Sequence, residues 1–106
     1  MGRGLPLLLL LLSCADAAPT RDLEVAGFVL EIDTREPIEG ARVTFRSDTL
    51  YEVTTTSDEE GRYELFVVSD SKFGQVIAEK EGFSTAEQSV FFDQPQRRID
   101  LEMRAQ

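Results

Sequence analysis

The chain of 106 residues is long enough for one domain around one core, and it carries a net charge of −9. So acidic a surface repels phosphate backbones, which excludes nucleic acid as an expected partner. The sequence has no histidine and one cysteine, which excludes Ser-His-Asp and Cys-His catalysis, the commonest zinc ligand and any disulfide within the chain.

The first twenty residues have the pattern of an export signal. A basic start at Arg3 is followed by an apolar run, Leu5–Leu12, which is far shorter than the roughly 20 residues that span a bilayer. Two cleavage sites are open. Ala15-Asp16-Ala17 has the small-x-small form of an ordinary signal peptidase site, whereas Leu11-Leu12-Ser13-Cys14 resembles the bacterial lipobox.

The lipobox interpretation is favoured because a thiol can be thioether-linked to diacylglycerol, and several acyl chains on one residue anchor a protein stably. It divides the chain into a signal peptide over 1–13, cleaved before Cys14, a tether over 14–22 and a domain over 23–104. Cys14 is then the lipidation site, and the protein is expected at the cell envelope as an outer-membrane lipoprotein. Cleavage after Ala17 would instead give a soluble secreted or periplasmic protein.

The remaining sequence has the pattern of short strands separated by turn residues. In one of them Ala41, Val43 and Phe45 alternate with polar residues, which is the period of a half-buried strand. No window combines helical apolar spacing with helix caps. Seven strands are predicted, over 23–33, 40–47, 50–57, 61–68, 73–83, 84–92 and 97–103.

This pattern predicts an all-β sandwich. Its inward-facing residues are predicted to be Val25, Val29, Val43, Phe45, Tyr63, Leu65, Ile99 and Leu101.

Four short motifs follow one another in this region. Gly27 lies early in the first strand, Pro37–Val43 forms a turn into the second, Thr56–Tyr63 forms a hairpin and Lys80–Phe83 forms a corner. In this order, over about 23–103, they resemble the carboxypeptidase regulatory-like domain. The resemblance implies a Greek-key-like, transthyretin-like β-sandwich that serves as a non-catalytic module.

The glycines and one tyrosine in these motifs allow predictions of backbone conformation and burial. Gly40 and Gly61 are expected at positive φ in their turns, and Gly82 permits a sharp corner that points Phe83 inward. Tyr63 is expected to bury its ring and keep its hydroxyl near the surface.

Candidate chemistry in the domain is sparse. The acidic turn 57–60 offers carboxylates for Ca²⁺, but it lacks the spaced acids of a calcium loop. The related adhesin repeats join a lysine to an asparagine, and this chain has Lys72 and Lys80 but no asparagine. We therefore expect no catalytic residues, no metal and no cofactor.

The alternative function is that of a carbohydrate-binding module of the starch-binding-like type. Tyr51, Phe91 and Phe92 are the candidates to stack on sugars, and one of the two phenylalanines must face outward in a regular strand. The main expectation remains a non-enzymatic, lipid-anchored envelope protein with a structural or protein-interaction sandwich. Its partner is expected to be an envelope protein or a surface polysaccharide.

Overall fold

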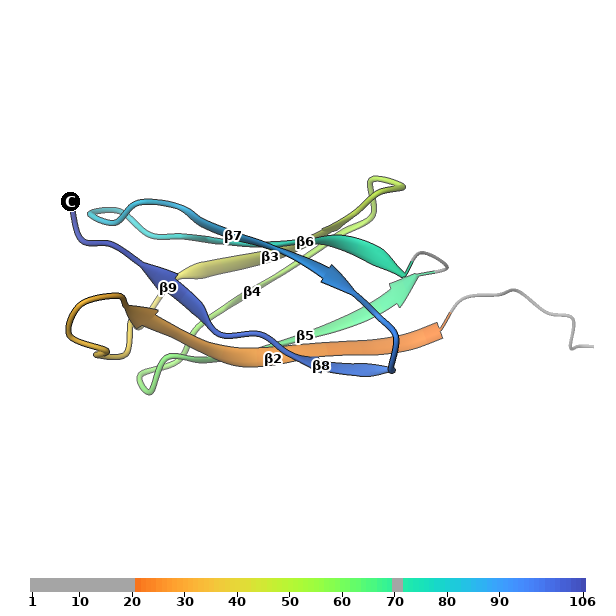
Figure 1. The fold of residues 1–106 in the computed structure, drawn as a ribbon, viewed down its shortest axis with the longest axis horizontal. Helices are drawn as coiled ribbons and strands as arrows, with labels where there is room; N and C mark the ends of the chain where they lie inside the picture. The colour runs from red at the N-terminus through yellow and green to blue at the C-terminus, as the bar shows by residue number, and fades with distance from the viewer. Residues whose placement is uncertain (1–20, 70–71) are drawn as a thin grey trace, which may run out of the picture.

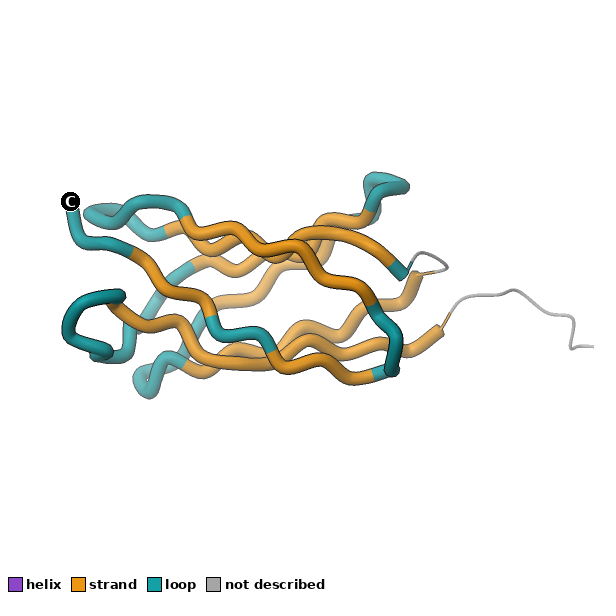
Figure 2. Tube along the Cα trace, in the orientation of Figure 1, coloured by secondary structure: helices purple, strands orange, loops and turns teal. Residues whose placement is uncertain are grey.

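The computed structural model describes residues 21–69 and 72–106, so the predicted signal peptide and Cys14 lie outside the described residues. Within these ranges the chain forms two facing β-sheets and no helix (Figures 1 and 2). None of these residues belongs to a helix that could cross a membrane. The strands are β2 (Arg21–Glu31), β3 (Arg42–Ser47), β4 (Glu52–Thr56), β5 (Arg62–Ser69), β6 (Phe73–Glu79), β7 (Ala86–Phe91), β8 (Gln96–Arg98) and β9 (Leu101–Met103).

The strands divide into two sheets of four. The first has β2 at its centre, with β5 antiparallel on one side and β8 and β9 parallel, one after the other, on the other side. The second has the order β4-β3-β6-β7, and all its pairs are antiparallel. The predicted all-β sandwich is confirmed.

The core lies between the sheets. All eight residues predicted to face inward are buried, because each strand alternates its side chains between the two faces. The ring of Phe45 packs edge-to-face on that of Phe92 at 5.8 Å between centroids. Burying the apolar faces of both sheets in this way accounts for most of the stabilisation that a domain of this size can draw on.

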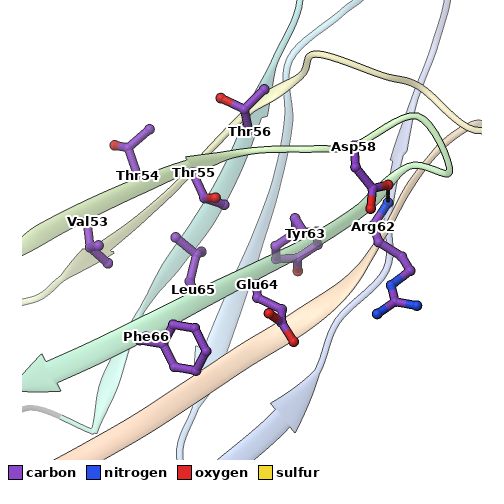
Figure 3. A pocket seen from close by; sticks show the side chains of 10 residues that line it. All are labelled: Val53, Thr54, Thr55, Thr56, Asp58, Arg62, Tyr63, Glu64, Leu65 and Phe66. Carbon is purple, nitrogen blue, oxygen red and sulfur yellow. Dashed lines mark hydrogen bonds between the residues drawn. The ribbon is translucent and has the colours of Figure 1, made fainter.

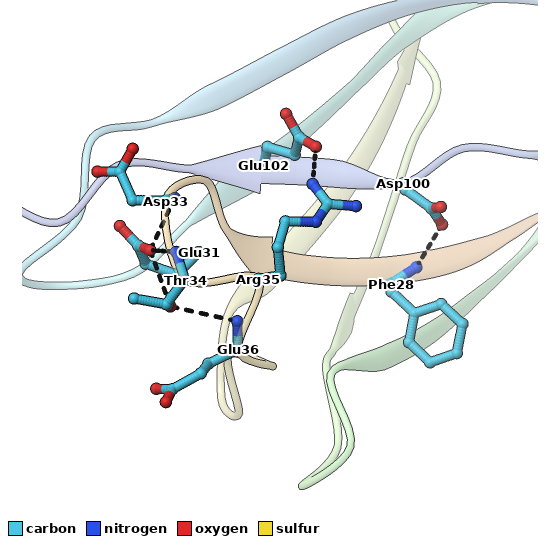
Figure 4. Close-up of polar contacts among 8 residues, drawn as sticks. All are labelled: Phe28, Glu31, Asp33, Thr34, Arg35, Glu36, Asp100 and Glu102. Carbon is cyan, nitrogen blue, oxygen red and sulfur yellow. Dashed lines mark hydrogen bonds and ion pairs between the residues drawn. The ribbon is translucent and has the colours of Figure 1, made fainter.

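The last strand differs from the prediction. One strand was expected over 97–103, but the structure has β8 and β9 with a break at Ile99 and Asp100, which gives eight strands instead of seven. At the break the Asp100 Oδ1 accepts the backbone N–H of Phe28 at 3.0 Å (Figure 4). A side-chain oxygen thus replaces the backbone carbonyl that would have continued the ladder.

Gly27 and Tyr63 explain why the backbone of Ile99, at this break, can lie so close to β2. A Cβ at Gly27 would lie 2.0 Å from the backbone oxygen of Ile99, so only glycine fits there. The Tyr63 hydroxyl donates to that same oxygen at 2.5 Å. The expectation of a surface hydroxyl was therefore wrong. Burial raises the pKa of Tyr63, and the charge of Asp100 raises it further.

The turns carry the predicted glycine conformations. Gly40, Gly61 and Gly82 have φ values of 79°, 80° and 90°. The hairpin around Gly82 is wider than predicted, because β6 ends at Glu79 and β7 begins at Ala86. Phe83 in this hairpin is partly buried against the core, as the predicted corner requires.

Candidate functional site

The two sheets leave a groove on one side of the sandwich, between the edge strands β4 and β5. It encloses about 470 Å³ (Figure 3). No hydrogen-bonded ladder joins the two strands within the described part of the chain. The groove is lined by Val53, Thr54, Thr55, Thr56, Asp58, Arg62, Tyr63, Glu64, Leu65 and Phe66.

Hydrogen-bond alternation shows which backbone groups of β4 face this groove. The amides of Ser57 and Ser47 donate to the oxygens of Ala41 and Tyr51, so the odd-numbered residues of β4 bond to β3. The backbone groups of the even-numbered residues, such as Thr54, therefore point away from β3. They form an unpaired sheet edge.

The hydrogen bonds of β5 alternate in the same way. Val29 N–H donates to the Gly61 oxygen at 2.7 Å, which places the odd-numbered residues of β5 against β2. The backbone groups of Glu64 and Phe66 then face the groove. Val68 N–H also points there, and it donates to the Tyr51 hydroxyl at 3.2 Å. Tyr51 thus bridges the start of β4 and the end of β5, beyond the residues that line the groove.

The acidic turn considered for calcium closes one end of the groove. Asp58 Oδ1 accepts the backbone N–H groups of Glu60 and Arg62, both at 2.9 Å, and Figure 3 shows the bond from Arg62. This carboxylate therefore has a structural role in the hairpin. Among the described residues, no three His, Cys, Asp or Glu side chains are grouped so that they can hold a metal ion.

The three residues predicted to stack on sugars do not lie together. Tyr51 is half-buried and its hydroxyl bonds to Val68. Phe92 lies in the core and Phe91 faces outward, so one of the pair is exposed, as alternation requires. Sequence reasoning missed Phe73, which lies directly opposite Phe91 in the β6–β7 ladder and is also exposed.

The lysines considered for a crosslink are separate as well. Lys80 Nζ donates to the backbone oxygen of Glu39 at 2.6 Å, while Lys72 is exposed beside β6. Cys14, the predicted lipidation site, lies outside the described residues.

The two ends of the sandwich differ in chemistry. The near end, where β2 begins, contains Arg21 and the loops 48–51 and 92–95 and lies on the right in Figure 1. The far end, where the C-terminus is marked, contains the loops 32–41, 57–61 and 80–85.

The far end is acidic. Its loops hold Asp33, Glu36, Glu39, Asp58, Glu59, Glu60 and Glu81, against two basic residues, Arg35 and Lys80. Glu31 organises one loop by accepting the N–H groups of Thr34 at 2.6 Å and Asp33 at 2.8 Å (Figure 4). The hydrogen bond from the Thr34 backbone lowers the pKa of Glu31 most. The bonds from the Thr34 hydroxyl and from the Asp33 backbone lower it further.

The near end is rich in exposed apolar residues. Leu50 is 82% exposed at the tip of its loop, and Phe91 and Phe73 are 53% and 46% exposed. Val68, near the end of β5, is 52% exposed. Leu50 also has a φ of 70°, a left-handed conformation that a branched side chain rarely adopts.

Comparisons with known proteins agree with the fold. The chain is similar to 3-chlorocatechol 1,2-dioxygenase from Rhodococcus opacus 1CP, with a TM-score of 0.66 and 11% identity over 88% of this chain and 63% of that one. It is also similar to the shaft pilin SpaA from Lactobacillus rhamnosus GG, with a TM-score of 0.64 and 14% identity over 81% of this chain and 47% of that one. The chain thus spans less than two thirds of either protein.

No curated protein matches the sequence. At these identities the two structures show the fold alone. A family model does match, however: the model of the carboxypeptidase regulatory-like domain covers residues 24–104. The chain belongs to the carboxypeptidase regulatory-like domain family.

Proposed function

We propose that this protein is a non-catalytic, lipid-anchored module of a bacterial cell envelope that binds another protein. The observation that carries the proposal is the groove between β4 and β5, where two sheet edges present unpaired backbone groups. An exposed edge of this kind accepts an extended segment of another chain as an added strand.

The side chains of the groove fit an extended peptide. Val53 and Leu65 form the apolar floor of the groove, while Thr54 and Glu64 supply polar groups along its two edges (Figure 3). Backbone pairing to either edge would provide affinity, and the floor would select small apolar side chains at alternate positions of the peptide. An anchored module with such an edge would hold an envelope partner close to the membrane.

The test places a photo-crosslinking residue at Glu64, in the groove, and as a control at Glu87, on the outer face of the other sheet. We expect a defined crosslinked partner from position 64 in intact cells and none from position 87. A Thr54→Pro change removes an edge N–H that does not bond to β3, so it should weaken the crosslink without breaking the β3–β4 ladder.

Thr54→Ala is the matched control, because it keeps the edge N–H and loses the same Thr44–Thr54 hydroxyl contact. Equal crosslinking from positions 64 and 87, or a crosslink that both Thr54 variants keep unchanged, would contradict strand addition.

A carbohydrate-binding module is the second candidate, and the exposed Phe73–Phe91 pair is the observation that favours it. Retention on a glycan array that disappears with Phe91→Ala and persists with Leu50→Ala would support this function. A wild-type protein that no glycan retains would exclude it.

A further inference from the structure

Among the described residues, four of the five exposed large apolar side chains lie at one end of the sandwich, and the fifth, Phe66, lines the groove. Leu50, Val68, Phe73 and Phe91 all lie at or next to the near end, although they come from a loop and three different strands. Phe73 and Phe91 are directly opposite each other, and Asp48, beside Leu50, donates its N–H to the Phe73 oxygen at 3.2 Å. This backbone bond places the loop 48–51, which carries Leu50, next to the start of β6, and we call Leu50, Phe73 and Phe91 the apolar rim.

The chain enters the domain at this same end. Seven residues, 14–20, separate Arg21 from the start of Cys14, and an extended chain of that length spans at most about 25 Å. A lipid group on Cys14 would therefore keep the near end within about 25 Å of the bilayer in any orientation. The far end can reach the surface only if the domain tilts toward the bilayer.

The far end is unsuited to a bilayer surface. Its loops carry seven acidic residues against Arg35 and Lys80, and such a surface favours water and is repelled by anionic headgroups. The near end is mixed in charge, because Asp48 and Asp93 are offset by Lys72 and by Arg97, which pairs with Asp93 at 3.3 Å, so it has no net charge that would attract it to the bilayer. Apolar contact is the interaction that remains.

The backbone of Leu50 adds an independent observation. A left-handed conformation favours Gly, Asn or Asp, yet the loop holds a leucine there and exposes 82% of it. Neither the backbone nor the core benefits from this side chain. A contact outside the domain would explain its presence.

We propose that Leu50, Phe73 and Phe91 form a membrane-contact rim that rests in the headgroup region of the lipid bilayer and orients the domain with its acidic end outward. This inference rests on the proposed lipid anchor at Cys14. The three side chains enter to the shallow depth typical of interfacial residues, while the anchor supplies most of the affinity. The groove between β4 and β5 then runs away from the membrane, accessible to an envelope partner.

The test uses the full chain with a single introduced thiol. In the lipidated protein the Cys14 sulfur is held in a thioether, so a cysteine at position 50 is the only free thiol and can carry an environment-sensitive fluorophore. Glu59→Cys, in an exposed far-end loop, is the matched control. The proteins are reconstituted in phosphatidylcholine vesicles that contain a spin-labelled lipid.

We expect the spin label to quench the fluorophore at position 50 about threefold more than at position 59, because only the rim reaches the headgroup region. Equal quenching at both positions, in protein whose intact mass shows the acyl chains, would overturn the inference and leave the anchor standing. A mass without acyl chains would instead refute the proposed anchor.

A second copy of the chain is the competing occupant of the rim. The Cys14→Ser, Leu50→Cys protein, labelled at position 50 and studied without lipid, distinguishes the two. We expect an emission maximum that does not change with protein concentration. A concentration-dependent blue shift would assign the rim to self-association and overturn the proposal.

Discussion

Gly61 and Leu50 have nearly the same backbone conformation at opposite ends of the sandwich, with φ values of 80° and 70°. At the far end the residue is glycine, and a side chain there would collide with Val29 and Pro37. At the near end it is a leucine whose side chain extends into open space. Arg35 in a far-end loop also has a left-handed φ, of 65°, but its side chain pairs with Glu102, whereas the Leu50 side chain is 82% exposed.

This difference separates two roles within one small domain. The far-end turns are explained by the fold alone, through Gly61, Asp58 and Glu31, whose contacts all lie within the domain. The near end needs an explanation outside the domain. Substitutions at the two ends should therefore have opposite effects on stability and on membrane contact.

The largest loss of unfolding free energy is expected for Gly61→Ala. The added Cβ would lie 2.8 Å from the Val29 oxygen in a left-handed backbone, so strain and overpacking should together cost about 3 kcal/mol of unfolding free energy in urea titrations. Gly82→Ala is the control, because its φ is 90° but no atom lies within 4 Å of the new Cβ. It should cost about 1 kcal/mol. Equal losses would show that the close packing at Gly61 is unimportant.

Tyr63→Phe is expected to rank second. It leaves the buried Ile99 oxygen without the hydroxyl donor, which should cost about 2 kcal/mol in the same titrations. The raised pKa of Tyr63 also predicts a pH effect. Because the folded tyrosine resists ionisation, its contribution is complete below the ordinary value of about 10 and is lost as the pH rises above it.

The difference between wild type and Tyr63→Phe isolates this effect. Wild type should lose unfolding free energy more steeply than the variant between pH 9 and 11, taken as a window around that ordinary value of about 10. Parallel pH profiles would mean that the hydroxyl is already accessible to solvent in the folded protein.

Leu50→Asn should change the unfolding free energy less, and it should raise it. Asparagine tolerates the left-handed backbone, so the variant should gain about 0.5 to 1 kcal/mol of unfolding free energy. At the same time its loop should lose protection from aqueous quenchers on vesicles. Thr49→Ser, one residue away, keeps the hydroxyl that bonds to the Ser47 hydroxyl at 2.9 Å and should change neither property. A loss of stability in Leu50→Asn would show that the leucine serves the fold after all.

The smallest effect concerns the far-end loop around Glu31. The lowered pKa of this exposed carboxyl means that its contribution is present above the ordinary glutamate value and is lost as the pH falls through the folded value. In NMR titrations the Thr34 amide should follow a midpoint below about 4.3. Glu31→Gln should abolish that titration, whereas Glu36→Gln should leave it in place.

Much of the fold could be predicted because it depends on local pattern. Alternation is enough to assign Val43 and Phe45 to the core, and the turn motifs around Gly40 and Gly61 are enough to predict their left-handed backbones. The break between β8 and β9 could not be predicted. It depends on Asp100 meeting Phe28, 72 residues earlier in the chain, and no local pattern encodes such a contact.

The site was less accessible to sequence reasoning. Alternation required one of Phe91 and Phe92 to face outward, but only the packing of Phe92 on Phe45 decides which one. The rim was missed because Leu50, Phe73 and Phe91 reach the same end of the sandwich only through the order β3-β6-β7 in the second sheet. Exposed residues that gather from distant segments leave no signal in a single sequence.

The most direct test of the account is the intact mass of the mature protein, measured with its membrane partitioning for wild type and Cys14→Ser. If the protein is lipid-anchored, the wild-type chain begins at Cys14, carries added acyl mass and sediments with membranes. Cys14→Ser should then lose both the acyl mass and the membrane fraction. A wild-type chain that begins at Ala18, carries no lipid and stays in the soluble fraction would contradict the anchor and remove the reason for the near end to face a bilayer.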